Sequence, residues 1–297
     1  MNFLKYAFFQ GQFVPFVNAN ISIATQCFQY GTGAFGGMRG TVKDGKTLLF
    51  RVSDHAKRLS NSAKFLNFEI SPEQISSKIL EFVKINKSTK DFYIRPMVYV
   101  SDLGIAPKLY DCKKDFLIYG LELGNYLNPK GVSCRFSSWV RQEDRSTPLR
   151  AKISGSYVMS SMAKTEAVAS GFDEALIFNT QGKICEASAM NIFIVRNNVI
   201  YTPSTDQDIL EGITRDSVIQ IAKYLGYQVI ERPIDKTEIL IADEVFLTGT
   251  AGKVTPVYKI ENYNLPEFQP ITDQIQQKFI SIIEGNDSDF AHWITIV

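Results

Sequence analysis

Residues 150–157 of this chain read RAKISGSY, and residues 186–193 read EASAMNIF. The first stretch places Lys152 among small and apolar neighbours, and the second places Glu186 at the end of a predicted strand. Apolar surroundings disfavour the charged form of a lysine and free its amine to form an imine with an aldehyde. A carboxylate that faces a pyridine ring holds the ring nitrogen protonated. Together the two residues predict a site for an aldehyde cofactor such as pyridoxal 5'-phosphate, with Lys152 as the catalytic residue.

Simpler interpretations of the same residues remain open. Taken alone, Lys152 suits the exposed edge of a strand, and Glu186 suits a turn. Tyr157 could bond the phenolic oxygen of such a cofactor, and it equally suits a buried core position.

Two segments rich in small residues are typical of phosphate binding. Residues 210–216, LEGITRD, start a predicted helix at a glycine, where the amides of Ile213 and Thr214 and a hydroxyl can face an anion. Residues 248–253, TGTAGK, follow an apolar strand but lack the glycine spacing of a Walker A loop. Both segments also suit an ordinary helix start and an ordinary strand-end turn.

Three arginines are further candidates for binding anions. Tyr93 and Arg95 alternate along a predicted strand, so they face one side, where a guanidinium could grip a carboxylate. Arg58 falls on a predicted helix, where either solvent exposure or a phosphate contact is expected, and Arg39 closes a glycine-rich run. We expect His55 to cap or pack rather than to act as a base.

The composition limits the class of protein. A chain of 297 residues, 45% apolar, can bury one or two cores, and a net charge of +1 makes a nucleic-acid partner unexpected. Four scattered cysteines fit a reducing compartment, and two histidines argue against a His/Cys metal site, so no metal is expected. Apolar runs stay short of the ~20 residues of a membrane span, and the start is too short for a signal peptide. We therefore expect a soluble cytoplasmic enzyme that acts on small molecules.

The order of predicted elements indicates an α+β fold. We expect a hairpin over residues 3–14, a flexible glycine-rich loop over 30–40, a helix over 54–66 capped by Asp54, and a helix from 71 toward 82 with a capping box at Ser71 and Gln74. Strands are expected at 92–100, 116–121, 132–138, 175–178, 191–195, 228–231 and 243–248, and helices at 158–170, 213–225 and 271–283. Strands and helices mix without strict alternation, which favours two α/β lobes. We place a small N-terminal domain at 1–123, a linker at 124–131 and a large C-terminal domain at 132–297.

Several motifs together resemble the fold-type IV pyridoxal-phosphate enzymes, and most closely the branched-chain amino acid aminotransferases of bacterial type. The resemblance runs from about residue 8 to residue 257. It is carried, in order, by YGTGAFGGMRG, FRVSDHAKRLSNSAKFL, FYIRPMVY, AKISGSYV, EASAMNIF, DILEGITRDSVI and DEVFLTGTAGKVTPV. The resemblance implies a two-lobed fold with the cofactor between the lobes, and a dimer or higher oligomer of identical chains.

The resemblance also implies roles for individual residues. Lys152 would form the Schiff base and carry the proton, Glu186 would pair with the pyridine nitrogen, and Arg95 would receive an acidic side chain. The cofactor-binding set is Arg58, Lys152, Tyr157, Glu186, Asn191, Ile213, Thr214 and Thr250. The substrate-binding set is Tyr30, Phe35, Gly37, Arg39, Tyr93, Arg95, Gly249, Thr250 and Ala251. The expected reaction passes the amino group of a branched-chain L-amino acid (Leu, Ile or Val) to 2-oxoglutarate.

The chain departs from the family pattern around the substrate pocket. Gly36 stands where a glutamate is frequent, Glu122 where a tyrosine is common, and Met190 where a glutamate often precedes Asn191. The loop of residues 139–145 is more charged than the family pattern. A D-amino acid transaminase or an aminodeoxychorismate lyase would keep both Lys152 and Glu186.

Two functions outside the family remain as alternatives. Ser161-Met-Ala-Lys164 matches the Ser-x-x-Lys motif of acyl-enzyme hydrolases, although its usual partner motifs are missing. A phosphate-binding module without catalysis would use only the anion-binding segments.

Overall fold

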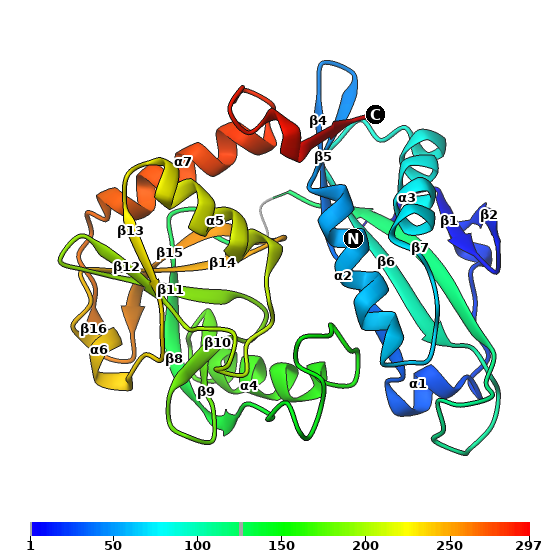
Figure 1. Cartoon of the computed structure of the whole chain (residues 1–297), viewed down its shortest axis with the longest axis horizontal. Helices are drawn as coiled ribbons and strands as arrows, with labels where there is room; N and C mark the ends of the chain where they lie inside the picture. The colour runs from blue at the N-terminus through cyan, green and yellow to red at the C-terminus, as the bar shows by residue number, and fades with distance from the viewer. Residues whose placement is uncertain (1, 125–126) are drawn as a thin grey trace. The chain divides into compact units, whose positions relative to one another are not determined.

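The computed structural model describes residues 2–124 and 127–297, which form two compact units (Figure 1). The first unit comprises residues 2–124, 151–156 and 282–297, and the second comprises residues 127–150 and 157–281. Each unit has its own sheet, helices and apolar core. The predicted α+β class is confirmed.

The first unit is built on an eight-stranded antiparallel sheet in the order β17-β5-β4-β6-β7-β1-β2, with β3 paired to β6. The bounds are β1 Tyr6–Phe9, β2 Gln12–Pro15, β3 Gly33–Phe35, β4 Met38–Lys43, β5 Lys46–Phe50, β6 Phe92–Val100, β7 Lys114–Glu122 and β17 Ile294–Ile296. In β6, Phe92 and Ile94 are buried, while Tyr93 and Arg95 between them are only partly buried. This alternation puts Tyr93 and Arg95 on one face, as predicted.

Two helices of the first unit, α2 (Val52–Lys64) and α3 (Pro72–Asn86), pack on each other and against the sheet (Figure 1). The shorter elements of the unit are α1 Gln26–Tyr30 and the 3-10 turns Phe16–Asn18 and Ala291–Trp293. The capping box at the start of α3 is confirmed. The N–H of Gln74 donates to Ser71 Oγ (3.2 Å), and the N–H of Ser71 donates to Gln74 Oε1 (2.9 Å). Two otherwise unpaired donors of the helix end are thereby satisfied.

The start of α2 differs from the prediction that Asp54 caps the helix. Arg51 is the capping residue, with a left-handed backbone at φ 50°, and Asp54 lies in the first turn. The Nε of Arg51 donates to Asp54 Oδ2 at 2.7 Å. The arginine therefore engages the carboxylate that was expected to bond the helix amides.

The prediction of a flexible loop over residues 30–40 is wrong, because most of this segment forms β3 and β4. The glycines make room for neighbouring side chains. A Cβ on Gly33 would lie 2.4 Å from Met97 Cε, and a Cβ on Gly40 would lie 2.6 Å from Phe92 Cζ. Among these glycines, positive φ occurs at Gly31 (64°), which ends α1. The glycine content reflects close packing of strands as well as backbone freedom.

The second unit contains a closed ring of strands in the order β10-β9-β8-β15-β14-β11, because β10 pairs with both β9 and β11. Three further strands extend it, with β12 on β11, β13 on β12 and β16 on β15. The bounds are β8 Val132–Val140, β9 Glu174–Phe178, β10 Ile184–Ala187, β11 Asn191–Arg196, β12 Val199–Thr202, β13 Gln228–Glu231, β14 Glu244–Gly249, β15 Lys253–Ile260 and β16 Tyr263–Asn264. The pair that closes the ring is Glu186 and Asn191.

Helices flank this ring. The helix α4 (Tyr157–Ala169) packs on β8 and β9, and α5 (Ile213–Tyr224) packs on β13 and β14. The remaining helices are α6 Lys236–Leu240 and α7 Pro270–Ile283. Across residues 2–124 and 127–297, every helix is too short or too polar to cross a membrane.

The division into units differs from the predicted domains in two places. Residues 151–156 and 282–297, expected in the C-terminal domain, group with the first unit. Within the expected linker of residues 124–131, Gly124 groups with the first unit and residues 127–131 with the second, while residues 125–126 lie outside the described residues. The linker itself stays a prediction.

Candidate active site

The segment that carries Lys152 is hydrogen-bonded into the first unit. The N–H of Phe35 donates to the Lys152 carbonyl (3.0 Å), and the N–H of Ser154 donates to the Gly33 carbonyl (2.8 Å). On its other side, the N–H of Lys152 donates to Ser62 Oγ on α2 at 3.1 Å. These bonds fix the backbone of Lys152 between β3 and α2.

The amine of Lys152 lies near other cationic groups. Its Nζ is 5.0 Å from the centroid of the Phe35 ring. The pKa of the buried His55 is held well below its usual value, first by desolvation and then by the charges of Arg58, Arg51 and Lys152. Arg51, His55 and Arg58 follow one face of α2 at helical spacing. This cationic cluster around a neutral imidazole suits an anion such as a phosphate.

Four residues predicted for the substrate pocket, Phe35, Gly37, Tyr93 and Arg95, lie together in the first unit and are called the Phe35 group below. The Arg95 guanidinium lies 4.3 Å from the Phe35 ring centroid, and its Nη2 donates to the Tyr93 hydroxyl at 3.2 Å. A Cβ on Gly37 would lie 2.0 Å from that hydroxyl. Because Lys152 also lies over the Phe35 ring, the predicted lysine and the predicted pocket residues share one aromatic side chain.

Two predicted substrate residues have other surroundings. Tyr30 is partly exposed at the end of α1, and its hydroxyl donates to the Ile105 carbonyl at 2.5 Å. Arg39 is buried, and its Nη2 donates to Asp91 Oδ2 (3.3 Å) and to the carbonyls of Leu123 and Gly124 (3.1 Å each). These bonds anchor the chain just after β7. The substrate role of Arg39 stays a prediction that these contacts do not favour.

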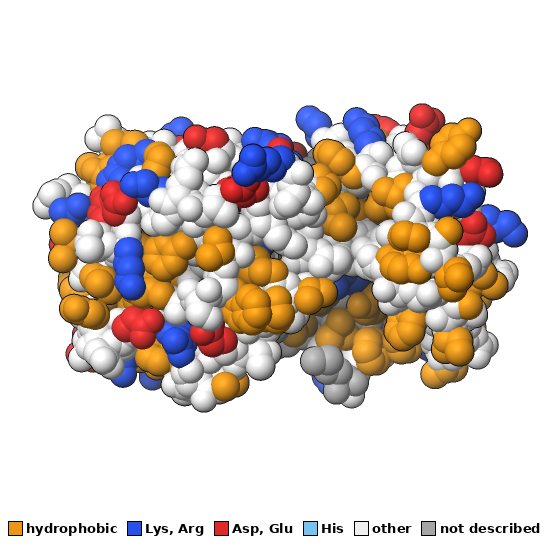
Figure 2. All heavy atoms as spheres, turned by 90° about the horizontal axis from the view of Figure 1, so that it is seen from below, with side chains coloured by type: hydrophobic (Ala, Val, Ile, Leu, Met, Phe, Trp, Pro, Cys, Tyr) orange, Lys and Arg blue, Asp and Glu red, His pale blue; other side chains and the backbone are white. Residues whose placement is uncertain are grey.

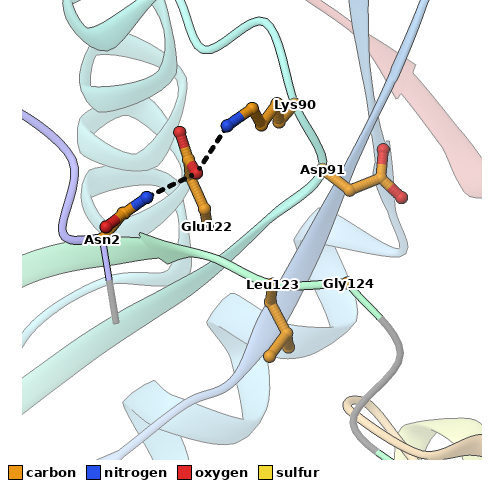
Figure 3. A pocket seen from close by; sticks show the side chains of 6 residues that line it. All are labelled: Asn2, Lys90, Asp91, Glu122, Leu123 and Gly124. Carbon is orange, nitrogen blue, oxygen red and sulfur yellow. Dashed lines mark hydrogen bonds and ion pairs between the residues drawn. The ribbon is translucent and has the colours of Figure 1, made fainter.

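Glu122, one of the departures from the family pattern, lies at the end of β7 in a shallow pocket (Figure 3). Its Oε2 accepts hydrogen bonds from Asn2 Nδ2 and Lys90 Nζ at 3.1 Å each. These two hydrogen bonds, with Asn2 contributing most, lower the pKa of the Glu122 carboxyl. The contacts of Glu122 are therefore local, and Lys152 and the Phe35 group do not line this pocket.

Glu186 lies in the second unit, where its buried carboxylate has at least three donors. Arg141 Nη2 lies 2.8 Å from Glu186 Oε1. The other oxygen, Oε2, accepts from Asn191 Nδ2 (3.0 Å) and from the N–H of Leu210 (3.1 Å). An arginine at this distance favours the ionised form of a carboxylate. The strand pair that closes the ring of the second unit therefore carries a buried carboxylate held by several donors.

The N-terminus of α5 lies beside this carboxylate. Gly212 is the capping residue and gives no side-chain cap, and Ile213 and Thr214 in the first turn are buried. A Cβ on Gly212 would lie 2.1 Å from Asn191 Oδ1, so glycine is required for this approach. Asn191 thus links the predicted ring-nitrogen partner to the predicted phosphate-binding helix.

The turn of residues 250–252 joins β14 to β15 next to the start of β11, where Asn191 pairs with Thr248. The buried Thr248 Oγ1 has no hydrogen-bond partner among the described residues. Met190, another departure from the family pattern, packs against this turn. Cβ atoms on Gly249 and Gly252 would lie 2.9 Å and 2.8 Å from its side chain.

Each unit carries groups that suit part of a phosphorylated pyridine aldehyde. The first unit carries an amine and a cationic cluster. The second unit carries a buried carboxylate and a helix N-terminus without a side-chain cap. The unsatisfied hydroxyl of Thr248 leaves a polar atom available for a ligand. The family Amino-transferase class IV matches residues 33–260.

This chain belongs to the class IV aminotransferases.

Known class IV aminotransferases resemble it over nearly their whole length. A probable branched-chain-amino-acid aminotransferase of Synechocystis sp. is 56% identical, and the match covers 98% of this chain and 97% of the relative. The crystal structure of the branched-chain aminotransferase from Thermoproteus uzoniensis with norvaline has a TM-score of 0.96 at 35% identity, with 99% of both chains covered. A second crystal structure, of the T.th. branched-chain amino acid aminotransferase complexed with N-(5'-phosphopyridoxyl)-L-glutamate, has a TM-score of 0.93 at 36% identity, again with 99% of both chains covered. The family and the fold type inferred from the motifs are confirmed.

Sequence reasoning missed several groups that surround the predicted class IV residues. Arg141 attracted notice only as part of a charged loop, although it lies directly after β8 and contacts Glu186. The backbone donor of Leu210 and the hydroxyl of Ser62 gave no pattern in the sequence. A buried carboxylate requires compensating donors, and this requirement could have directed attention to Arg141.

The Ser-x-x-Lys alternative is not favoured by the structure. Lys164 Nζ lies 2.9 Å from the carboxylate of the buried Glu174 and also donates to the Asp173 carbonyl. The Lys164 amine is therefore engaged by two oxygen acceptors of residues 173 and 174. Tyr157, the remaining cofactor candidate, is the first residue of α4 and is partly buried.

Proposed function

We propose that this chain transfers the amino group of a branched-chain L-amino acid to 2-oxoglutarate, giving the branched 2-oxo acid and L-glutamate, with pyridoxal 5'-phosphate as cofactor. The observation that carries the proposal is the buried Glu186 carboxylate, with donors from Arg141, Asn191 and Leu210, in a class IV aminotransferase. A carboxylate of this kind is what a pyridine nitrogen needs in order to remain protonated.

The predicted cofactor-binding residues would divide the contacts to the cofactor among them. Glu186 would bond the ring nitrogen, and Tyr157 the phenolic oxygen. Arg58, the amides of Ile213 and Thr214, and the hydroxyl of Thr250 would hold the phosphate, since helix N-termini and guanidinium groups favour anions. When bound, the cofactor supplies an aldehyde carbon that carries the amino group and a ring that withdraws electrons.

Lys152 would act as the proton carrier at the reacting carbon. Its amine takes the proton from the substrate Cα and returns one to the atom that receives the amino group. The hydrogen bond from Lys152 N–H to Ser62 fixes the backbone from which this side chain extends.

The Phe35 group would meet two kinds of substrate side chain. The rings of Phe35 and Tyr93 offer apolar surface to an aliphatic side chain, and Arg95 offers a guanidinium to the carboxylate of glutamate. The turn of Gly249, Thr250 and Ala251 would receive the carboxylate on the substrate Cα. Two relatives support this pair of substrates, since one structure contains norvaline and another contains a phosphopyridoxyl glutamate.

Steady-state kinetics with a substrate panel tests the proposed function. We expect the holoenzyme to use L-leucine, L-isoleucine and L-valine with 2-oxoglutarate, and to use D-alanine at least about 100-fold less efficiently. Faster turnover of D-alanine would identify a D-amino acid transaminase instead. Pyruvate release from aminodeoxychorismate as the dominant activity would identify a lyase. The Lys152→Ala variant is the control for background chemistry.

We also propose that the chain forms a homodimer. Two adjoining segments of the first unit, residues 21–30 and 103–110, expose large apolar side chains, including Ile23 (86% exposed), Phe28 (69%) and Ile105 (85%). The segments are joined by backbone hydrogen bonds such as Gly104 N–H to the Ala24 carbonyl (3.3 Å). Figure 2 shows hydrophobic side chains gathered on the corresponding lower face of the first unit. Contiguous exposed apolar surface of this kind is typical of protein interfaces.

We propose a cytoplasmic location. All four cysteines are free thiols, and two of them, Cys134 and Cys185, are buried. Free thiols in this number favour a reducing compartment.

A further inference from the structure

The ion pair between Arg141 and Glu186 is almost completely buried. The side chains are 7% and 6% exposed, and Arg141 Nη2 lies 2.8 Å from Glu186 Oε1. Burial of a charged group costs free energy unless the partner and hydrogen bonds compensate. This pair therefore differs from the exposed ion pairs of a protein surface, and its burial calls for a specific explanation.

Arg141 is itself fixed at two further points. Its N–H donates to the carbonyl of Phe178 at the end of β9 (2.8 Å), and its Nε donates to the carbonyl of Asp208 (3.1 Å). Two residues further along the chain, the N–H of Leu210 donates to Glu186 Oε2. The guanidinium, the carboxylate and the backbone of residues 208–210 therefore form one closed ring of contacts.

The two oxygens of Glu186 have different partners. Arg141 contacts Oε1, while Asn191 and Leu210 donate to Oε2. Asn191 Nδ2 also donates to the Leu210 carbonyl at 2.9 Å, which holds the amide in one orientation. The carboxylate plane is thus fixed from two sides, and a fixed plane determines where an N–H donor can approach it.

We propose that Arg141 is a positioning residue that keeps Glu186 ionised and oriented toward the ring nitrogen of the cofactor. The inference rests on the proposed function. Without the arginine, desolvation would favour the neutral acid, and a neutral acid no longer attracts the proton of the ring nitrogen. Arg141 acts through Glu186, so its effect disappears where Glu186 has no charge or the ring has no nitrogen.

A double-mutant cycle separates this role from a general loss of structure. We expect Arg141→Met and Glu186→Gln each to lower kcat/KM by about 10–100-fold, the usual effect of removing a residue that orients an active-site ligand. The double variant should be no slower than Glu186→Gln alone. If the two effects multiply in the double variant, Arg141 does not act through Glu186.

Cofactor binding gives a readout that does not depend on activity. Absorbance titration of the apo-protein should show about tenfold weaker binding of pyridoxal 5'-phosphate to Arg141→Met than to the unmodified chain. Binding of 1-deazapyridoxal 5'-phosphate, in which carbon replaces the ring nitrogen, should be equal in both proteins. Equal weakening for both compounds would indicate structural damage and overturn the inference.

Two further variants complete the design. Arg135→Met removes an arginine within β8, paired to Glu166 at 3.9 Å, and should leave both binding and activity unchanged. Arg141→Lys keeps the charge but loses the planar guanidinium that reaches both Glu186 and Asp208. Its cofactor binding and kcat/KM should lie between those of the unmodified chain and Arg141→Met. This variant replaces Arg141→Met in the test if the methionine variant does not fold. A wild-type chain that binds no pyridoxal phosphate would refute the proposed function. If the wild-type enzyme is active and the effects of Arg141→Met and Glu186→Gln multiply in the double variant, only the role of Arg141 is refuted.

Discussion

The hydroxyl of Tyr93 occupies the space that a side chain on Gly37 would need, since a Cβ there would lie 2.0 Å away. Gly37 directly precedes β4, which pairs with β6, the strand that carries Tyr93. The Tyr93 hydroxyl also accepts a hydrogen bond from Arg95. A change at Gly37 should therefore displace Tyr93 and Arg95 in the predicted pocket.

This relationship predicts the behaviour of Gly37→Ala. The methyl group should displace the Tyr93 ring and, with it, Arg95. A displacement of about 1 Å costs up to about 100-fold in catalytic efficiency, and we expect the loss mainly as a higher KM for 2-oxoglutarate. Absorbance of the bound cofactor should be unchanged, because Gly37 is not among the predicted cofactor residues. A variant with normal kinetics would place the substrate pocket elsewhere.

The role of Lys152 has a chemical test. Borohydride treatment of the holoenzyme should attach the cofactor covalently to one lysine, and peptide mapping should find the label in the peptide of residues 150–157. Lys164 serves as the internal comparison, since its amine is paired with Glu174. Label on any other peptide would remove Lys152 from its assigned role.

Substitution at Gly212 should affect the predicted phosphate-binding end of α5. Its φ of −72° suits any residue, so the effect of Gly212→Ala would be steric, through contact with Asn191 Oδ1 at 2.1 Å. Forcing an extra carbon into a packed position costs about 1–3 kcal/mol. We expect this loss in the free energy of unfolding together with weaker cofactor binding. Calorimetry and absorbance titration would measure the two effects, and unchanged binding would separate α5 from the phosphate site.

His55 should make the folded state sensitive to acid. Its pKa is depressed by burial and by nearby cations, so below its ordinary value of about 6.5 the unfolded chain binds a proton that the folded chain does not. The free energy of unfolding should therefore fall as the pH decreases below about 6.5, by up to about 1.4 kcal/mol per pH unit from this residue. Denaturant unfolding at pH 7.5 and pH 5.5 should show a smaller fall in the free energy of unfolding for His55→Gln than for the unmodified chain. His292→Gln, at the exposed histidine, is the matched control, and equal falls in all three proteins would contradict the prediction.

The proposed homodimer predicts the effect of charge on the exposed apolar segments. Ile105→Lys should shift the protein from dimer to monomer in light scattering after size exclusion, because a buried lysine without a partner is unfavourable. Ile241→Lys introduces the same charge at a residue of the second unit that is 64% exposed and should remain dimeric. Dimers in both variants would exclude this surface as the interface.

Local chemistry makes some elements predictable from the sequence. The capping box of Ser71 and Gln74 needs only four consecutive residues, and the alternation of β6 needs only nine, so the predictions of both are confirmed. The strands β3 and β4 escape prediction because their glycines suggest flexibility, whereas contacts with Met97 and Phe92 far along the chain explain them. The pairing of β17 with β5 joins residues almost 250 positions apart, and no local pattern predicts it.

The candidate site shows the same limit. The motifs predict roles for Lys152 and Glu186, while Arg141 is visible in the sequence only as an unexplained charge. Its role depends on burial and on the path of residues 208–210, which arise from tertiary packing. Arg39 is assigned to the substrate pocket because it closes a glycine-rich run in the sequence. Its hydrogen bonds to backbone carbonyls depend on tertiary packing, which the sequence does not show.

The position of β17 has a consequence for biosynthesis. The ribosome makes β5 early, but residues 294–296, which cover its edge, emerge only after the whole second unit has been made. During that interval the nascent chain presents an open strand edge, which invites pairing with other polypeptides. Removal of residues 282–297 would make this transient state permanent, and aggregation rather than simple loss of activity should follow.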